Sequence, residues 1–169
     1  MMAWLMTYDP REAEFIVKSE LEWLKQRIAF NIVAQGANAT GKTIESMKVT
    51  TTPQGGMLTG RAYFGTLETG RRPTNPNTNN RVNLYSIIYD WMMAKGVHAQ
   101  DKTDVSLAWA ITKSIHKKGT RLFQQGGRDT IYSKEITKTI ENVMKRLNGL
   151  ISTNIHTINL NTKDGGLIK

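Results

Sequence analysis

Cysteine is absent from this chain of 169 residues, and acidic residues are few beside the basic ones. Without cysteine there can be no disulfide, no thiolate nucleophile and no cysteine metal site. Only four prolines interrupt the chain. No apolar run approaches the roughly 18 residues that a membrane helix requires. We therefore expect a folded protein that is assembled in a reducing cytoplasm and has no membrane partner.

The basic excess gives a formal net charge of +9, and it is concentrated in the middle of the chain. Residues 36–128 hold 13 Lys and Arg against 5 Asp and Glu, a local balance of +8. Residues 1–35 hold 4 basic and 5 acidic residues, a balance of −1. Such a field attracts polyanions or acidic protein surfaces, although a solvated basic face without a partner explains it equally well.

Periodicity and turn chemistry predict an α+β fold that opens with a long N-terminal helix. Asp9 suits the N-cap, Pro10 suits the first helical position, and Glu12 completes a capping box. Gly36 suits the position just after the helix. Between these signals, one helix face carries an apolar stripe of Val17, Leu21, Leu24, Ile28 and Ile32.

A β-hairpin, or a small antiparallel sheet, is expected next. Apolar and polar residues alternate from Met47 to Thr52 and again from Leu58 to Phe64. The segment from Pro53 to Gly56 supplies the turn between these strands. Because two strands are marginally stable alone, the hairpin needs a helix across one face or strands from another subunit.

Three further helices are expected after a polar loop at residues 69–81. The first spans residues 84–95, and the second spans residues 105–118 with Asp104 as its cap. A second basic loop is expected at residues 122–128. The apolar stripe of the first of these helices consists of Leu84, Ile87, Ile88 and Trp91.

The last helix begins near Ser133 and carries a heptad-like apolar seam, for which core packing is the favoured explanation. The seam consists of Ile136, Ile140, Val143, Leu147 and Leu150. We expect a single connector-like domain over residues 1–160 and a flexible C-terminal tail over residues 161–169.

One segment matches the P-loop pattern literally: residues 36–43 read G-A-N-A-T-G-K-T. A working P-loop needs a buried strand before the loop and a helix after it, with Lys42 on the phosphates and Thr43 on magnesium. Here the preceding residues have the period of a helix and the following ones alternate like a strand. We interpret the match as a helix C-terminus and a turn rather than a nucleotide site.

No other pattern indicates catalysis, a metal site or a bound cofactor. His98, His116 and His156 share no metal-ligand spacing. Asp101 and Asp104 lie three residues apart, but a helix cap explains the second. The four tryptophans lie on or near helical stripes and are interpreted as core or interface anchors. The sequence therefore predicts that the protein is not an enzyme.

The basic loops are the candidate interaction sites. Arginine suits phosphate or carboxylate recognition through its planar fork. No sequence-specific DNA-binding motif accompanies these loops, so any DNA contact is expected to be non-specific. The residues predicted to face a partner subunit or DNA are Arg71, Arg72, Arg81, Lys117, Lys118, Arg121 and Arg128.

The order of elements resembles the tail-completion and head–tail connector (neck) proteins of tailed bacteriophages. That family has a Thr-Gly-x-x-x-x-Ser segment before a hairpin, and here residues 40–46 are similar to it. The family also has a Gly-Thr or Glu-x-Gly segment after the second strand. Phe64-Gly65-Thr66 and Glu68-Thr69-Gly70 are similar to that segment.

The resemblance implies a structural virion protein of the neck or tail-completion ring. Such a subunit joins the portal or adaptor region to the tail, in a ring of 6 or 12 copies that lies against portal, adaptor or tail-tube proteins. It contacts genomic DNA in the channel non-specifically and is assembled in the host cytoplasm. The motifs do not separate a neck ring from a tail terminator. The alternatives are a small basic nucleic-acid-binding protein and, least favoured, a P-loop nucleotide hydrolase.

Overall fold

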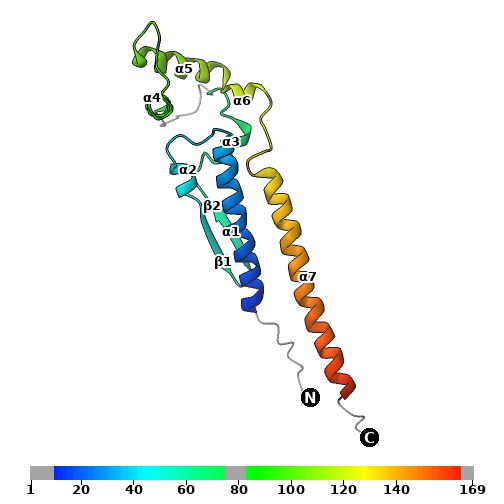
Figure 1. The fold of residues 1–169 in the computed structure, drawn as a ribbon. Helices are drawn as coiled ribbons and strands as arrows, with labels where there is room; N and C mark the ends of the chain where they lie inside the picture. Colours follow the sequence, from blue (N-terminus) through cyan, green and yellow to red (C-terminus); the bar gives the residue numbers. More distant parts are fainter. Residues whose placement is uncertain (1–9, 75–82, 165–169) are drawn as a thin grey trace. The chain divides into compact units, whose positions relative to one another are not determined.

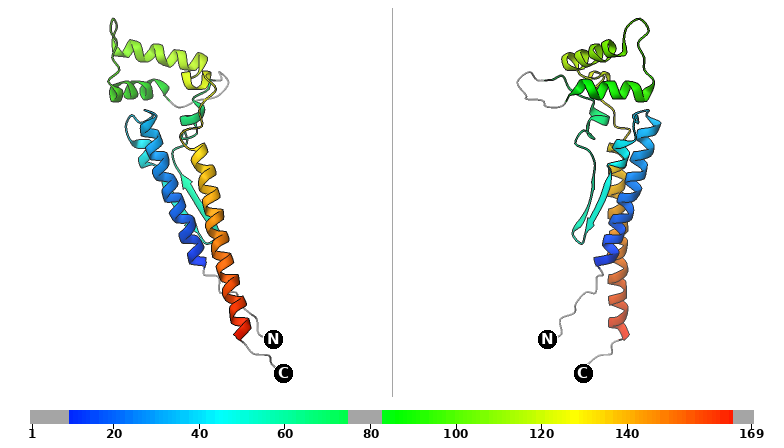
Figure 2. Two further views of the ribbon diagram at one scale, coloured as in Figure 1. Left: turned by 45° about the vertical axis from the view of Figure 1, so that its right-hand side comes forward. Right: turned by 90° about the vertical axis from the view of Figure 1, so that its left-hand side faces the viewer.

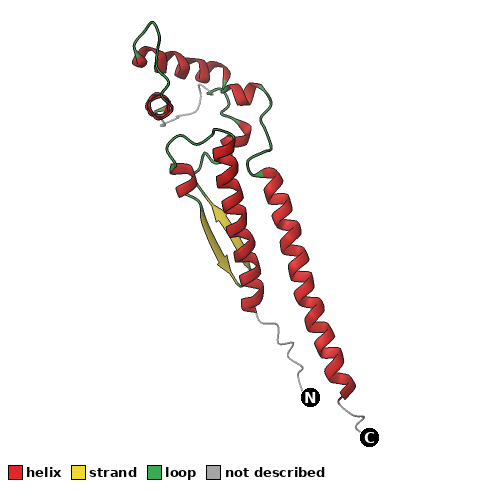
Figure 3. Ribbon diagram, in the orientation of Figure 1, coloured by secondary structure: helices red, strands yellow, loops and turns green. Residues whose placement is uncertain are grey.

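The computed structural model describes residues 10–74 and 83–164, and it is an α+β fold as predicted (Figure 1). The described chain is mostly helical and holds one two-stranded sheet (Figure 3). The predicted cap Asp9 lies outside the described residues. The elements are α1 (Pro10–Ala34), α2 (Lys42–Glu45), β1 (Lys48–Thr52), β2 (Gly55–Thr59), α3 (Thr66–Thr69), α4 (Leu84–Lys95), α5 (Asp104–Lys118), α6 (Arg121–Gln124) and α7 (Ser133–Asp164).

The chain divides into two compact units. The first unit consists of Met1–Arg27, Lys48–Thr59 and Glu135–Lys169. The second unit consists of Ile28–Met47 and Gly60–Lys134. None of the helices in the described part of the chain is both long and apolar enough to cross a membrane.

In the first unit the hairpin runs alongside α1 (Figures 1 and 2). A Cβ atom added at Gly56 would lie 2.5 Å from Leu21 Cδ1 and 2.7 Å from Val17 Cγ1. The absence of a side chain at this position therefore lets the strand lie directly on the apolar stripe of α1. The hydroxyl of Thr51 also donates a hydrogen bond to Glu14 Oε1 over 3.0 Å.

The hairpin is shorter than its alternation predicted. The register pairs Lys48 with Thr59 and Thr52 with Gly55, so the turn consists of Pro53 and Gln54 alone. Because β1 has only five residues, β2 pairs with it only as far as Thr59. The prediction that the second strand reaches Phe64 was therefore wrong, and hydrogen-bonded turns occupy residues 61–66 instead.

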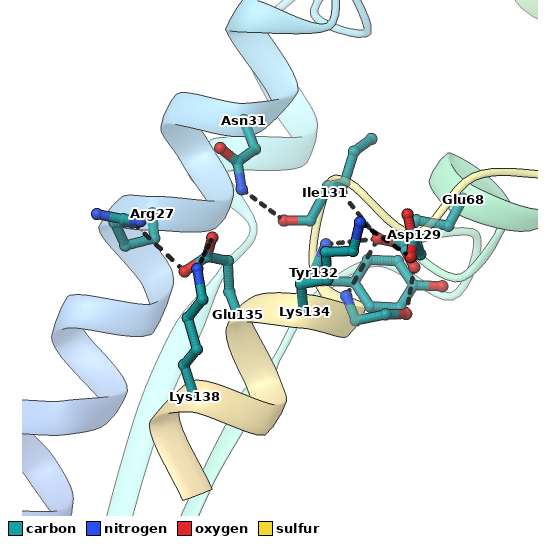
Figure 4. A network of polar contacts seen from close by, with 10 residues as sticks. Arg27, Asn31, Glu68, Asp129, Ile131, Tyr132, Lys134, Glu135 and Lys138 are labelled. Atoms are coloured by element: carbon teal, nitrogen blue, oxygen red, sulfur yellow. Dashed lines mark hydrogen bonds and ion pairs between the residues drawn. The ribbon is translucent and has the colours of Figure 1, made fainter. Parts of the chain in front are cut away.

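Polar contacts join α7 to α1 within the first unit. Arg146 donates from one guanidinium nitrogen to Glu20 Oε1 and to Ser19 Oγ, each over 2.8 Å. Arg27 pairs with Glu135 over 3.4 Å (Figure 4). The helix continues through Asp164, so residues 161–164, which were predicted to belong to a flexible tail, are helical.

In the second unit α4 and α5 form a helical hairpin (Figure 2). The predicted bounds of α4 are confirmed. Thr103 rather than Asp104 caps α5, since its side chain accepts the Ser106 N–H over 3.3 Å. Residues 122–128 were predicted to be a loop. They begin instead inside the one-turn helix α6, because Thr120 accepts the Phe123 N–H over 3.4 Å.

Burial follows the predicted stripe of α1 but not the stripes of α4 and α7. Leu24, Ile28 and Ile32 of α1 are buried. In α4, Leu84 and Met92 are buried, whereas Ile87 and Trp91 are exposed. In α7, Ile136 and Ile140 are exposed, and Val143, Leu147 and Leu150 are only half-buried. The prediction that the α7 seam is core was therefore wrong for its first two members.

Candidate functional site

Two segments that are distant in sequence meet beside the C-terminal end of α5, within the second unit. The Arg71 N–H donates to Thr120 Oγ1 over 3.0 Å, and the Thr120 N–H donates to the Arg71 carbonyl over 2.9 Å. Four residues before Thr120, the carbonyl of His116 in α5 accepts the Thr74 N–H over 3.0 Å. These bonds fix residues 71–74 against residues 116–120.

The junction gathers five of the seven basic residues predicted to face a partner. We call Arg71, Arg72, Lys117, Lys118 and Arg121 the basic patch. Arg71 is half-buried and the other four are exposed. Residues 105–128 contain no Asp or Glu, and neither do residues 69–82. Within the described residues, no member of the patch has an ion-pair partner, so its positive field is not neutralised.

The remaining two predicted residues are Arg81 and Arg128. Arg81 lies outside the described residues. Arg128 is half-buried, and its Nε donates to the Leu67 carbonyl over 3.0 Å while its N–H donates to the Glu68 carbonyl over 2.9 Å. Arg128 thus holds backbone of the second unit in place.

Glu68 is the centre of a polar network that sequence reasoning missed (Figure 4). Its Oε1 accepts the backbone N–H groups of Ile131, Tyr132 and Ser133 over 2.8, 2.7 and 3.1 Å. Its Oε2 accepts the Ser133 hydroxyl. Only 3% of the residue is exposed. The carboxylate therefore accepts the N–H groups of the turn that leads into α7 and of the first residue of α7, and it places its charge at the positive end of the helix dipole.

Burial alone would raise the pKa of Glu68, but the hydrogen bonds from Ser133, Tyr132 and Ile131 outweigh it and hold that pKa below its ordinary value. The carboxylate is thus ionised and its acceptor positions are occupied. This arrangement suits a structural anchor rather than a general base. The only sequence signal was the Glu68-Thr69-Gly70 segment, which carried no hint of its partner 63 residues later.

The P-loop-like segment is preceded by a helix, as the sequence predicted, but the one-turn helix α2 rather than a strand directly follows it. It follows helix α1, and Gly36 with a φ of 63° ends that helix. Asn38 Oδ1 then accepts the Gly41 N–H over 2.9 Å, and the one-turn helix α2 leads into β1. Thr43 Oγ1 lies 3.3 Å from the Tyr63 hydroxyl. A buried strand would have to precede a phosphate-binding loop, and a helix precedes this one.

The histidines and aspartates form local contacts. Asp104 accepts the Ala99 N–H over 2.8 Å and contacts His98 Nδ1 at 2.9 Å, and these two contacts lower its pKa. His98, Ala99 and Asp101 are among the residues that line a shallow cavity of about 370 Å³. His116 Nδ1 contacts the Thr74 hydroxyl. Among the residues that the structure describes, no three His, Asp or Glu side chains are grouped to hold a metal ion.

Large apolar side chains are exposed on both long helices of the first unit. On α1, Phe15 is 67% and Trp23 is 62% exposed. At about 100° per residue, Phe15 lies roughly opposite the buried Leu24 around the helix. On α7 the exposed side chains are Ile136, Ile140, Met144 and Ile151. A shallow, mostly apolar cavity of about 500 Å³ is lined by Phe15, Ile16 and Leu150 together with Arg11 and Glu12.

No family model, no curated protein and no solved structure matches this chain.

Proposed function

We propose that this chain is a non-enzymatic structural subunit of a bacteriophage neck or tail-completion ring, and that it acts in the virion by assembly. The observation that carries the proposal is the set of exposed apolar side chains on α1 and α7. Exposing Phe15 and Trp23 to water does not stabilise a monomer. Aromatic side chains of this kind are, by contrast, the residues that contribute most to binding at protein interfaces.

The hairpin supports the same function. In the described chain it is a two-stranded sheet, so each strand has one edge without a strand partner. Such edges pair readily with strands from another chain. A subunit whose two sides differ forms heterologous head-to-tail contacts, and these close into a ring when the rotation between neighbours is right. Rings of 6 or 12 copies against portal, adaptor or tail-tube proteins are the assemblies proposed.

Assembly is tested by light scattering of the purified protein over a range of concentrations. We expect a species with the mass of 6 or 12 copies. Replacing Trp23 with alanine should weaken the subunit association constant about tenfold or more, because an exposed aromatic anchor is lost without damage to the core. The matched control is Trp109→Ala, which removes a tryptophan exposed to a similar degree in the second unit. A monomer at every concentration, unchanged by Trp23→Ala, would contradict the proposal.

A second candidate function, non-specific nucleic-acid binding, is favoured by the basic patch. It is compatible with DNA contact in a neck channel, but it would also suit a free nucleic-acid-binding protein. Replacing both Arg72 and Lys118 with alanine should weaken binding to duplex DNA and reduce the slope of log affinity against log salt by about 2. Because both side chains are exposed, the melting temperature should stay unchanged.

The matched control for that double variant is Lys25→Ala with Lys145→Ala, two basic residues of the first unit. An equal loss of affinity in both double variants would show that general charge, rather than the patch, drives binding. The P-loop alternative requires that nucleotide with magnesium raise the melting temperature and that Lys42→Ala abolish the shift. We expect no shift.

A further inference from the structure

Three aromatic rings of α4 and α5 form a column in the second unit. The Tyr89 and Tyr85 rings stack at 6.1 Å between centroids and 27° between planes. The Tyr85 and Trp109 rings stack at 4.6 Å and 23°. Trp109 ends the column, and 58% of it is exposed although Tyr85 covers one of its faces. The opposite face of the indole therefore lies toward solvent. Stacking on Tyr85 fixes the orientation of the Trp109 ring.

One side of α5 leads from this column to the basic patch. Trp109, Lys113 and Lys117 follow one another at intervals of four residues, which turns each only about 40° from the last around the helix. Lys113 and Lys117 are both exposed. Since residues 105–128 contain no acidic residue, nothing on α5 beyond Asp104 opposes this positive field.

We propose that Trp109 and this side of α5 form a binding site for single-stranded nucleic acid. A base stacks on the outer face of Trp109, and the phosphates that follow it contact Lys113 and the basic patch, of which Lys117 is a member. Aromatic rings beside a positively charged track are the usual means of holding single strands without sequence preference. The inference rests on the second candidate function, but it does not depend on ring assembly.

The chemistry of the site favours a single strand over a duplex. In a duplex the base faces are stacked on one another, so a duplex offers Trp109 no π-face and can use only the lysines and arginines. A protein partner fits less well, because lysine is depleted in the cores of protein interfaces and here it flanks the aromatic ring directly.

The site is tested by fluorescence anisotropy with a labelled 20-nucleotide oligo(dT) and a labelled duplex of the same length, at low and at physiological salt. Trp109→Ala should weaken oligo(dT) binding roughly 5- to 150-fold and change duplex binding less than about twofold. Trp109→Phe should keep most of the affinity, because it keeps a stacking face. Trp91→Ala, which removes another exposed tryptophan of the second unit, is the control and should change neither affinity.

Each other outcome has a distinct meaning. If wild type binds both nucleic acids and Trp109→Ala weakens both equally or neither, the stacking site is wrong while binding by the basic patch stands. If wild type binds neither at low salt, the second candidate function fails together with this inference. Circular dichroism shows whether Trp109→Ala folds. Should it not, Trp109→Leu against Trp109→Phe makes the same comparison at similar bulk.

Discussion

Replacing Glu68 with alanine is expected to destabilise the protein by about 3 to 5 kcal/mol. The substitution leaves the N–H groups of Ile131, Tyr132 and Ser133 without their acceptor at a site that is 3% exposed. Each buried donor that loses its partner costs about 1–3 kcal/mol, and water entering the gap recovers part of that sum. The start of α7 would also lose a charge that favours its dipole. Urea denaturation measures the free energy of unfolding.

The control for Glu68→Ala is Glu141→Ala, which removes an exposed glutamate from α7 and should change stability by less than about 0.5 kcal/mol. Equal losses in the two variants would contradict the anchoring role. Glu68→Gln separates charge from hydrogen bonding, since its carbonyl can still accept backbone N–H groups.

The same carboxylate should make stability depend on pH in a known direction. The pKa of Glu68 is lower in the folded protein than in the unfolded chain, where the pKa of a glutamate is about 4.3. The unfolded state therefore binds more protons in the interval between the two values. Stability from Glu68 is fully present above the unfolded pKa and is lost as the pH falls through the folded pKa. Glu68→Gln should flatten the stability profile in that acidic interval and leave it parallel to wild type at neutral pH.

Replacing Gly70 with alanine is expected to cost about 3 kcal/mol or more. Gly70 has a φ of 71° and a ψ of 175°, a backbone region that is essentially restricted to glycine. An added Cβ would lie 2.4 Å from Phe123 N and 2.6 Å from Thr120 Oγ1. The first of these is a backbone atom within α6, so it cannot move away as the end of a flexible side chain could. Thermal and urea unfolding measure the loss.

Gly96→Ala is the matched control for Gly70→Ala. Gly96 also has a positive φ, 63°, but a Cβ there would meet nothing within 4 Å. Only the left-handed backbone penalty of about 1–2 kcal/mol should remain. Equal costs at the two glycines would mean that α6 does not pack on Gly70 as described. Because Gly70 precedes Arg71, its substitution should also weaken binding that depends on the basic patch.

The sequence was informative wherever a structure depends on residues near one another in the chain. The helical stripe from Val17 to Ile32 and the glycine after it predicted α1, and the bounds of α4 were predicted correctly. The hairpin was predicted in kind but not in length. Apolar and polar residues go on alternating past Thr59, but strand pairing ends there because the partner strand β1 has only five residues.

For the candidate sites, the sequence predicted their chemistry but not their arrangement. It identified the basic loops, and the fold brought five of their seven residues to one junction through bonds between Arg71 and Thr120 and between Thr74 and His116. It did not indicate that Arg128 Nε donates to the Leu67 carbonyl, 61 residues away in the chain. Trp109 was interpreted as a core or interface anchor, and only the packing of α4 on α5 shows it exposed and stacked.

By itself the sequence determined the fold class, the first helix and the basic middle of the chain, because capping, periodicity and charge are properties of neighbouring residues. The tertiary structure alone decided that Glu68 anchors α7, where α5 and the residue 71–74 segment meet, and which apolar residues stay in water. These outcomes depend on contacts between segments some 40 to 65 residues apart. Residue type shows that a carboxylate, an arginine or a tryptophan can make a contact, but the path of the backbone determines which partner it reaches.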